Sequence, residues 1–303
     1  MKIQNKFYCV LNNQELRSQA LRTSDIVIIN AILEDYGFVV IENLLDVKAL
    51  SSLNEKMNRD YGAFKESKKK WIGGGLKMGN LNAAPPTCNE FISREILLNR
   101  ILHDVTSIFF NQDTVNIAYT ANTNTPGSHR QSFHSDNRSL NMDYLTISIP
   151  LCDVDESNGS TEMIPRTHRS KFSPIEVYKE LHKSVRINTK LGSAIIWFCS
   201  TWHRGTANGS AACRHMINLN HTYSSSRTFH DSDGIPIPES TLKSLILEGS
   251  RMKTCVGAEI DSTLFKPNYF GVGPSGWIKE IIFLSAPRTT ELLYAVYKRL
   301  RDR

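Results

Sequence analysis

The feature that most constrains the fold is a series of short strand-type segments between residues 114 and 223. Turn-forming pairs such as Asn158-Gly159 and Asn208-Gly209 separate some of these segments. Short apolar runs with turn residues between them are typical of β-strands. The segments are Thr114–Tyr119, Asp143–Leu151, Ser160–Ile164, Ser193–Cys199 and Arg214–Tyr223. This part of the chain therefore predicts a β-sandwich or barrel.

One of these segments alternates strictly between two kinds of side chain. Leu145, Ile147 and Ile149 are apolar, and Thr146 and Ser148 between them carry hydroxyl groups. Successive side chains of a strand point to opposite faces of its sheet. The segment is therefore expected to have one apolar face and one hydroxyl-bearing face.

The first third of the chain has mainly helical periodicity. Helices are expected over residues 24–36, 46–61 and 94–111, with a short strand over 38–41. Ser24 and Asp25 can cap the first helix, which Gly37 would end, and Asp46 can open the second. Helices at one end of a strand-rich chain favour a β-rich α+β fold in which helices cover the sheets.

Two further stretches have little regular pattern. Residues 65–86 are rich in glycine and lysine, so they are expected to form a long loop that acts as a lid over residues 65–90, with Gly73-Gly74-Gly75 as its hinge. The C-terminal part after residue 223 is irregular except for a helix expected over 289–301. No repeat or low-complexity linker divides the chain, so a single domain over residues 1–303 is predicted.

The charge balance is basic but not typical of a nucleic-acid-binding protein. Lysine and arginine number 36 against 30 acidic residues, a net charge of +6, and they concentrate in residues 65–70 and 298–303. Neither run contains interleaved aromatic residues on which bases could stack, so each is interpreted as a solvated face or a lid for an anionic small molecule. We expect no nucleic-acid partner.

The cysteine pattern and the hydropathy of the chain indicate the cellular compartment in which the protein is expected. Six cysteines are scattered without a CxxC pair, which indicates reduced thiols rather than a disulfide framework. No stretch reaches the length of about 20 apolar residues that a membrane span requires, and the N-terminus lacks a secretory hydrophobic region. A soluble, cytoplasmic protein without a membrane partner is expected, and its oligomeric state is left open.

His134 and Asp136 form the first chemical signal. Positions i and i+2 of a strand point the same way, so an imidazole and a carboxylate can converge on one ion. Nine histidines in a chain of this composition produce about one such pair by accident, and one is present. The motif alone therefore does not distinguish a metal site from chance.

His203 supplies a third ligand type. It follows the apolar segment 194–198, so it lies where a strand ends and loops carry function. Two histidines and one carboxylate on a β-scaffold are the facial triad of non-haem Fe(II) oxygenases, which leaves metal positions open. The same three ligands plus water also describe a catalytic zinc, so a zinc hydrolase remains an alternative.

Arg214 follows His203 by eleven residues and opens the last strand-type segment. If the two strands pair through the Asn208-Gly209 turn, Arg214 would lie in the sheet next to His203. Its planar guanidinium could then bind the distal carboxylate of a diacid through two charge-assisted hydrogen bonds. An ordinary surface cation is the competing interpretation.

Taken in order, these motifs resemble those of the phytanoyl-CoA dioxygenase family of Fe(II)/2-oxoglutarate-dependent oxygenases. The segments that carry the resemblance are Gln131–Asp136, Asn158–Arg169 and Trp202–Arg214, and the similarity extends over roughly 37–223. It implies a double-stranded β-helix, or jelly roll, flanked by helices. Residues 24–113 would be a mainly helical N-terminal part, 114–223 the jelly-roll core, and 224–303 a C-terminal extension.

The resemblance also implies roles for individual residues. His134, Asp136 and His203 would bind Fe(II), and Arg214 would bind the co-substrate 2-oxoglutarate. Gln131 and Thr161 match positions that contact 2-oxoglutarate in some relatives.

Two positions near these motifs bear on the chemistry. Gly205 stands where relatives often have a serine, so one expected hydroxyl is missing, and Thr206 is the nearest substitute. Family halogenases lack the carboxylate ligand. The presence of Asp136 therefore favours oxygenation or desaturation over halogenation.

The expected activity is oxidation of an unactivated C–H bond of a small molecule by Fe(II), 2-oxoglutarate and O₂, with release of succinate and CO₂. Hydroxylation, desaturation, cyclisation and endoperoxide formation are all compatible with these ligands, and secondary metabolism is the expected setting. The lysines of the predicted lid have two interpretations, a plain solvated loop or a contact with an acidic or carrier-bound substrate.

A non-catalytic jelly-roll module with a basic face is the second alternative. Proximity in sequence makes four residues candidates for contact with the substrate: Tyr119, Asn137, Arg138 and Trp202.

Overall fold

The computed structural model describes residues 1–66, 79–83, 93–131, 133–136, 144–172, 174–223 and 253–254. Its largest element is a mixed sheet with the strand order β1-β2-β3-β9-β6-β11-β5-β12, to which β4 adds by pairing with β5. These strands are β1 (Lys2–Ile3), β2 (Tyr8–Val10), β3 (Phe38–Glu42), β4 (Asn80–Ala83), β5 (Thr114–Asn124), β6 (Tyr144–Pro150), β9 (Ala194–Phe198), β11 (Arg214–Tyr223) and β12 (Lys253–Thr254).

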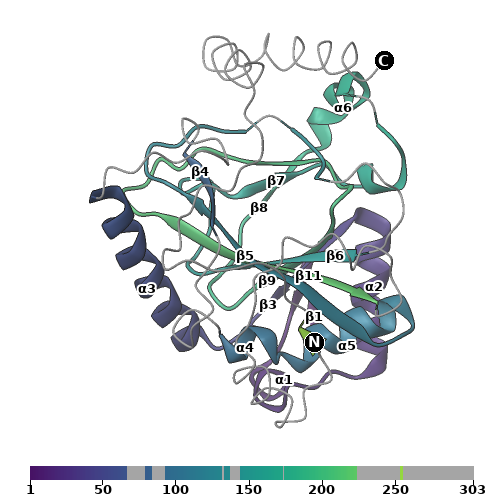
Figure 1. The fold of residues 1–303 in the computed structure, drawn as a ribbon. Helices are drawn as coiled ribbons and strands as arrows, with labels where there is room; N and C mark the ends of the chain where they lie inside the picture. Colours follow the sequence, from purple (N-terminus) through teal and green to yellow (C-terminus); the bar gives the residue numbers. More distant parts are fainter. Residues whose placement is uncertain are drawn as a thin grey trace.

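A second, smaller sheet has the order β10-β7-β8. It consists of β7 (Thr161–Met163), β8 (Val185–Ile187) and β10 (His203–Gly205), and all of its pairs are antiparallel. In Figure 1, β7 and β8 lie apart from the large sheet, across a central space. Together with the helices, the two sheets confirm the β-rich α+β fold expected from the sequence.

Helices cover the other face of the large sheet. They are α1 (Asn13–Ser18), α2 (Thr23–Tyr36), α3 (Val47–Glu66), α4 (Arg94–Leu97) and α5 (Arg100–Phe110). A further helix, α6 (Pro174–Glu180), lies away from this face in Figure 1 and packs through Val177 against Phe133, Ile164 and Trp202. α2 packs against α5, and α5 packs against β5 and β11 (Figure 1). The main hydrophobic core lies between these helices and the sheet, where Ile29, Leu33 and Ile101 are fully buried.

The alternation predicted for residues 145–149 is confirmed in β6. Leu145, Ile147 and Ile149 are completely buried in the core beneath the helices. Thr146 and Ser148 point to the opposite face, where they line a cavity. Because the side-chain period of a strand is two, one segment supplies both the core and the cavity wall.

The expected helix boundaries are partly corrected. α2 begins at Thr23, so Ser24 and Asp25 lie within its first turn instead of capping it, and Asp25 accepts a hydrogen bond from the Arg22 side chain. The ending at Gly37 is confirmed, since its φ of 89° is a left-handed conformation that glycine adopts without strain.

The single helix expected over 94–111 is wrong. It is divided into α4 and α5, because the backbone of Asn99 is extended and its side chain caps α5 by accepting a hydrogen bond from the backbone N–H of Leu102. Asp46 does open α3 as expected, by accepting bonds from the backbone N–H groups of Lys48 and Ala49.

The loop expected over 65–86 is also partly wrong. α3 continues through Glu66, and Asn80–Ala83 forms β4, which pairs with residues 121–124 of β5. Backbone pairing to an available strand does not require apolar periodicity, which explains why the sequence pattern missed it. The remainder of the predicted lid, the basic run at 298–303 and the helix expected at 289–301 lie outside the described residues.

Two other expectations concern the described residues only. No helix among them is long and apolar enough to cross a membrane. Within the same ranges Cys9, Cys152, Cys199 and Cys213 are all free thiols, as the scattered cysteine pattern predicted.

Three histidines are buried in the fold as neutral side chains. Burial lowers the pKa of His168 to about 4 and the pKa values of His215 and His221 to about 3. His215 bonds the Thr123 hydroxyl, and His221 bonds the Thr106 hydroxyl. Each imidazole therefore accepts a proton far more readily in the unfolded chain than in the native fold.

We predict that the free energy of unfolding of the metal-free protein is constant above about pH 6.5 and falls as the pH is lowered toward 4. In that window the unfolded state binds protons on these histidines and the native state does not. Urea unfolding at about pH 7.5, 6 and 5 measures the effect. A free energy that stays unchanged between pH 7.5 and 5 would contradict the prediction.

Candidate metal centre

The two histidines of the candidate site are joined through their backbones. His134 and His203 form an isolated antiparallel bridge, in which the N–H of each donates to the carbonyl of the other at 2.9 and 2.8 Å. Asp136, two residues further on, donates its N–H to the carbonyl of Cys199 at 3.0 Å. These main-chain bonds bring segments about 70 residues apart in sequence to one point.

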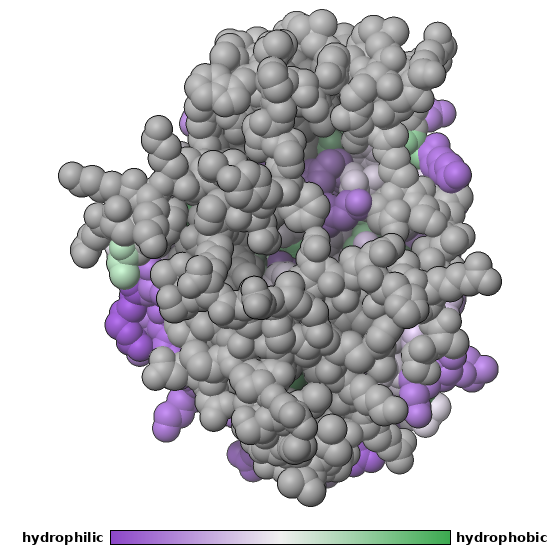
Figure 2. Space-filling model, viewed as in Figure 1, coloured by the Kyte–Doolittle hydropathy of each residue, from purple (hydrophilic) through white to green (hydrophobic). Residues whose placement is uncertain are grey.

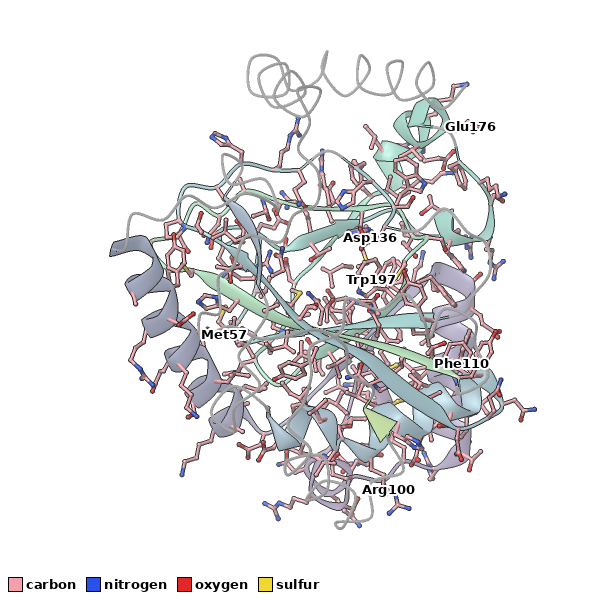
Figure 3. The ribbon with its side chains drawn as sticks, in the orientation of Figure 1. Met57, Arg100, Phe110, Asp136, Glu176 and Trp197 are labelled. Atoms are coloured by element: carbon pink, nitrogen blue, oxygen red, sulfur yellow. The ribbon has the colours of Figure 1, made fainter. Side chains whose placement is uncertain are left out.

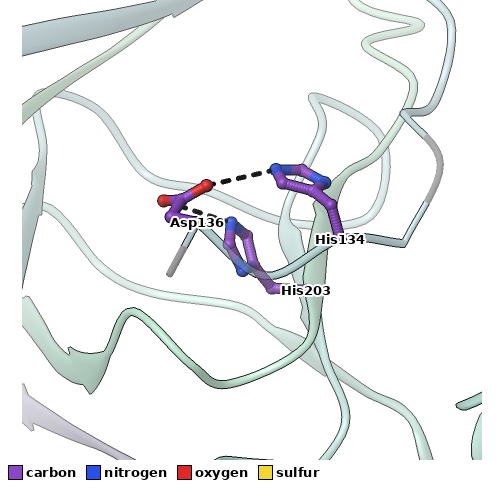
Figure 4. Close-up of side chains that lie close together, drawn as sticks. All are labelled: His134, Asp136 and His203. Atoms are coloured by element: carbon purple, nitrogen blue, oxygen red, sulfur yellow. Dashed lines mark ion pairs between the residues drawn. The ribbon is translucent and has the colours of Figure 1, made fainter. Parts of the chain in front are cut away.

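The three side chains converge as the sequence predicted (Figure 4). His134 Nε2 lies 3.5 Å from Asp136 Oδ1, and His203 Nε2 lies 3.8 Å from Asp136 Oδ2. One ligand atom from each residue lies within 4.8 Å of the others. Two imidazole nitrogens and one carboxylate oxygen at these distances can hold a divalent metal ion and leave coordination positions free.

The environment of His203 suits a metal ligand. Its Nδ1 lies 3.0 Å from the carbonyl oxygen of Thr201, to which it can donate only as N–H, so Nε2 carries the free lone pair toward Asp136. The indole ring of Trp197 packs edge-on at 4.5 Å between ring centroids. Burial lowers the pKa of His203, which keeps the imidazole neutral at physiological pH. Asp136 is about half exposed, with 49% of its side chain accessible, so the centre opens toward solvent on that side.

A cavity of about 530 Å³ surrounds these residues. Its walls come from β5, β6, β9 and β11 of the large sheet and from β7 and β10 of the small one. Figure 3 shows Asp136 and Trp197 in the space between the two sheets, and Figure 2 shows hydrophilic residues in a hollow on the same side of the molecule. All six residues that the sequence singled out line this cavity: His134, Asp136, His203, Arg214, Gln131 and Thr161.

Arg214 is a buried cation in the wall of the cavity. It is 2% exposed, its Nε has no hydrogen-bond partner, and Nη1 donates to Asn122 Oδ1 at 3.4 Å. Burial lowers its pKa to about 10, which still leaves it charged at neutral pH. Within the described part of the chain no carboxylate forms an ion pair with it. A buried charge without a partner is costly, so this site fits an anionic group of a ligand.

The placement of Arg214 differs from the expected one in a single respect. His203 begins β10 of the small sheet, whereas Arg214 begins β11 of the large sheet, so the two strands do not pair with each other. The turn at Asn208 connects the two sheets instead of forming a hairpin. Both residues still line one cavity because that cavity lies between the sheets.

Gln131 and Thr161 lie on either side of Gly205. The backbone N–H of Gly205 donates to Gln131 Oε1 at 2.8 Å, which leaves the amide N–H groups of Gln131 available as donors. Thr161 is the register partner of Gly205 in the small sheet, and with Met163 it faces the cavity, as the spacing of two residues predicted.

A side chain at Gly205 would require its neighbours to move. An added Cβ would lie 2.8 Å from Asn80 Oδ1 and 2.9 Å from Gln131 Oε1. The serine frequent in relatives would collide here, and Thr206 does not replace its hydroxyl. Thr206 is buried and donates to the carbonyl of Ser160, outside the cavity lining.

Two of the residues proposed for substrate contact are wrong. Tyr119 is 1% exposed in the core beneath the sheet, and Trp202 packs with Phe133, Ile164 and Val177 in a separate cluster. Proximity in sequence did not reveal on which side of the sheet each residue lies. Asn137 and Arg138 lie outside the described residues.

Sequence reasoning missed several residues that line the cavity. They are Trp197 on β9, Thr146 and Ser148 on β6, and Asn218 and Asn220 on β11. A signal was present, because residues at even spacing from Arg214 share its face of the strand. That spacing alone does not show whether the shared face lines the cavity or is buried beneath the helices.

We predict that Gly205→Ala lowers the free energy of unfolding by roughly 1–3 kcal/mol, because the added methyl group displaces Gln131 or Asn80. Gly209→Ala is the matched control, since its Cβ would lie 3.4 Å from the Ser157 carbonyl, an ordinary contact. Urea unfolding of both variants measures the difference. Equal stability of the two variants would show that the contact at Gly205 is not tight.

Solved structures of known proteins share this fold. SnoN, in complex with Fe³⁺, α-ketoglutarate and nogalamycin RO, superimposes with a TM-score of 0.57 at 13% identity, over 83% of this chain and 98% of SnoN. AviO1 from Streptomyces viridochromogenes Tue57 matches with a TM-score of 0.54 at 17% identity, over 68% of this chain and 98% of AviO1. EctD from S. alaskensis with bound Fe matches with a TM-score of 0.54 at 16% identity, over 68% of this chain and 78% of EctD. At these identities the likeness establishes the architecture.

The model of one protein family matches the sequence itself. It is described as phytanoyl-CoA dioxygenase (PhyH), and it covers residues 33–216, more than half of the chain. That range includes the three convergent side chains, the buried arginine and most of the strands that surround them. The chain therefore belongs to the phytanoyl-CoA dioxygenase (PhyH) family and is a 2-oxoglutarate-dependent non-haem iron enzyme.

Proposed function

We propose that this protein is an Fe(II)- and 2-oxoglutarate-dependent dioxygenase that oxidises an unactivated C–H bond of a small molecule. Hydroxylation, desaturation, cyclisation and endoperoxide formation are among the outcomes that its ligands allow, and succinate and CO₂ are the co-products. One observation carries the proposal. Two histidines and an aspartate converge in the same cavity as a buried arginine that has no carboxylate partner among the described residues.

His134, Asp136 and His203 are the proposed iron ligands. Their donor atoms are the nitrogen and oxygen types that iron accepts, and the three-residue set leaves coordination positions for co-substrate and O₂. When bound together, iron, 2-oxoglutarate and O₂ supply the oxidising chemistry, in which 2-oxoglutarate loses CO₂ and the C–H bond is broken. The hydrogen bond between His203 and the Thr201 carbonyl holds the imidazole in one tautomer and one orientation.

Arg214 is the proposed partner of the distal carboxylate of 2-oxoglutarate. Its guanidinium is already desolvated in the protein without ligand. A carboxylate of the ligand would therefore give this buried charge an oppositely charged partner. Gln131 and Thr161 are proposed to donate hydrogen bonds to the same co-substrate. The bond from Gly205 to Gln131 Oε1 supports this, because it directs the donor end of the amide away from the backbone.

The substrate is proposed to be a small molecule of secondary metabolism. SnoN comes from nogalamycin biosynthesis, and HygX from Streptomyces hygroscopicus, with a TM-score of 0.51 at 13% identity, was solved with hygromycin B. Membership of the oxygenase family, together with Arg214, favours this function over a zinc hydrolase, which has no need for a diacid site. It also favours an enzyme over a non-catalytic binding module.

We expect His203→Ala to abolish succinate production from 2-oxoglutarate and to lower the iron content of the purified protein, because one of three ligands is lost. Succinate release and oxygen uptake measure the activity, and a hydrolase would consume no oxygen. His129→Ala replaces an exposed histidine and is the matched control. A fully active His203→Ala enzyme would rule out the proposed centre.

We expect Arg214→Gln to raise the KM for 2-oxoglutarate at least about 30-fold, because truncation of one partner of a buried charge pair is costly. Iron binding should be retained, since Arg214 is not a proposed ligand. The exposed Arg17→Gln is the control. An unchanged KM would show that 2-oxoglutarate does not bind at Arg214.

A further inference from the structure

Among the polar side chains in the wall of the cavity that the proposed function does not use are two asparagines on one strand. Along β11 the cavity-lining residues are Arg214, Met216, Asn218 and Asn220. Arg214 and Asn220 are six residues apart, about 20 Å along an extended strand. The five-carbon chain of 2-oxoglutarate is much shorter than this distance. A co-substrate bound at Arg214 therefore leaves the asparagine end of the strand to another ligand.

Asn218 is held in one orientation by a chain of hydrogen bonds across three strands. Trp197 Nε1 donates to Ser148 Oγ at 3.1 Å, and Ser148 Oγ donates to Asn218 Oδ1 at 2.7 Å. An indole N–H can only donate, and a serine hydroxyl has one hydrogen. The first bond therefore has only one possible direction, and in the second the Ser148 hydroxyl donates its hydrogen to the amide oxygen of Asn218, which is thus occupied from within the sheet.

Asn220 is held in the same way by a parallel chain one step further along the sheet. Thr146 Oγ1 donates to Asn220 Oδ1 at 3.0 Å and lies 2.9 Å from Cys199 Sγ. With the single hydroxyl hydrogen of Thr146 directed to Asn220, the Thr146 oxygen is left as an acceptor that the thiol of Cys199 can donate to. Again the amide oxygen is the end that the sheet occupies.

Both amides consequently present their NH₂ groups, and not their oxygens, to the cavity. The residues behind them, Ser148, Thr146 and Trp197, are at most 6% exposed, so this arrangement is part of a packed wall. The described lining contains one carboxylate, that of Asp136, and one guanidinium, that of Arg214, and the proposed function assigns both. The asparagine wall is therefore rich in hydrogen-bond donors and carries no charge.

We propose that Asn218 and Asn220 recognise the substrate by donating hydrogen bonds to acceptor oxygens of an uncharged, polyhydroxylated ring. This inference rests on the proposed function, which reserves the Arg214 end for 2-oxoglutarate. Two donors about 7 Å apart on one strand face suit a rigid ring with oxygens on both sides. A cation would face N–H groups, and an anion would be desolvated without a counter-charge.

The test uses ¹⁵N-labelled protein loaded with zinc(II) and 2-oxoglutarate, which keeps the centre diamagnetic and unreactive. Three probes of one skeleton are titrated: methyl β-glucopyranoside, its 6-amino-6-deoxy derivative and methyl glucuronide. The side-chain NH₂ signals of Asn218 and Asn220 are identified by their loss in Asn218→Asp and Asn220→Asp. The neutral probe is expected to shift both signals and to bind at least fivefold more tightly than the cationic and anionic probes, as for one lost hydrogen bond.

Asn218→Asp replaces the outward donor with an acceptor that carries negative charge. It is expected to weaken binding of the neutral probe about fivefold and to strengthen binding of the amino probe, so that the preference inverts. Asn220→Asp should act in the same direction and serves as a second variant. The exposed Asn188→Asp adds the same charge outside the cavity and should leave the preference unchanged.

The outcomes separate the two proposals. Wild-type protein that does not bind zinc(II) or 2-oxoglutarate would contradict the proposed function. Protein that binds both, but whose two NH₂ signals respond to none of the probes, or respond best to the charged ones, would overturn the substrate inference alone. A preference that survives in both aspartate variants would overturn it as well.

Discussion

The centre of this protein depends on the pair of backbone hydrogen bonds between His134 and His203. They join a loop that follows β5 to the first residue of β10, and they place two imidazoles with ring centroids 4.4 Å apart. Asp136 is tied to the chain next to Trp197 by its bond to Cys199. Main-chain bonds thus position the three side chains, and a change of register in the small sheet would separate them.

The large sheet performs two tasks because strand side chains alternate. One face of β6 completes the core beneath α2 and α5, and the other carries Thr146 and Ser148 into the cavity. On β11 the same alternation places Arg214, Asn218 and Asn220 on the cavity face. A co-substrate region and an uncharged donor region can therefore lie along one strand, separated only by the rise per residue.

Burial sets the electrostatic character of these groups. Arg214 stays charged without a carboxylate partner among the described residues, whereas His203 and the three buried histidines of the fold are neutral. A desolvated cation is stabilised by an incoming anion, and a desolvated imidazole is a better ligand as a free base. The stability of the fold near pH 5 and the affinity for the co-substrate thus have the same physical origin.

The family, the three metal-ligand candidates, Arg214 and the alternation in β6 could all be predicted without coordinates, because they depend on residue type and on local spacing. The sequence by itself could not reveal that Arg214 and His203 belong to different sheets, that Asn80–Ala83 pairs with β5, or that Tyr119 and Trp202 face away from the cavity. The two-residue period of a strand shows that successive side chains lie on opposite faces of the sheet. It does not show which of the two faces is covered by helices. Only pairing between distant segments decides that, because the hydrogen bonds and contacts that define a face come from residues far away in the chain.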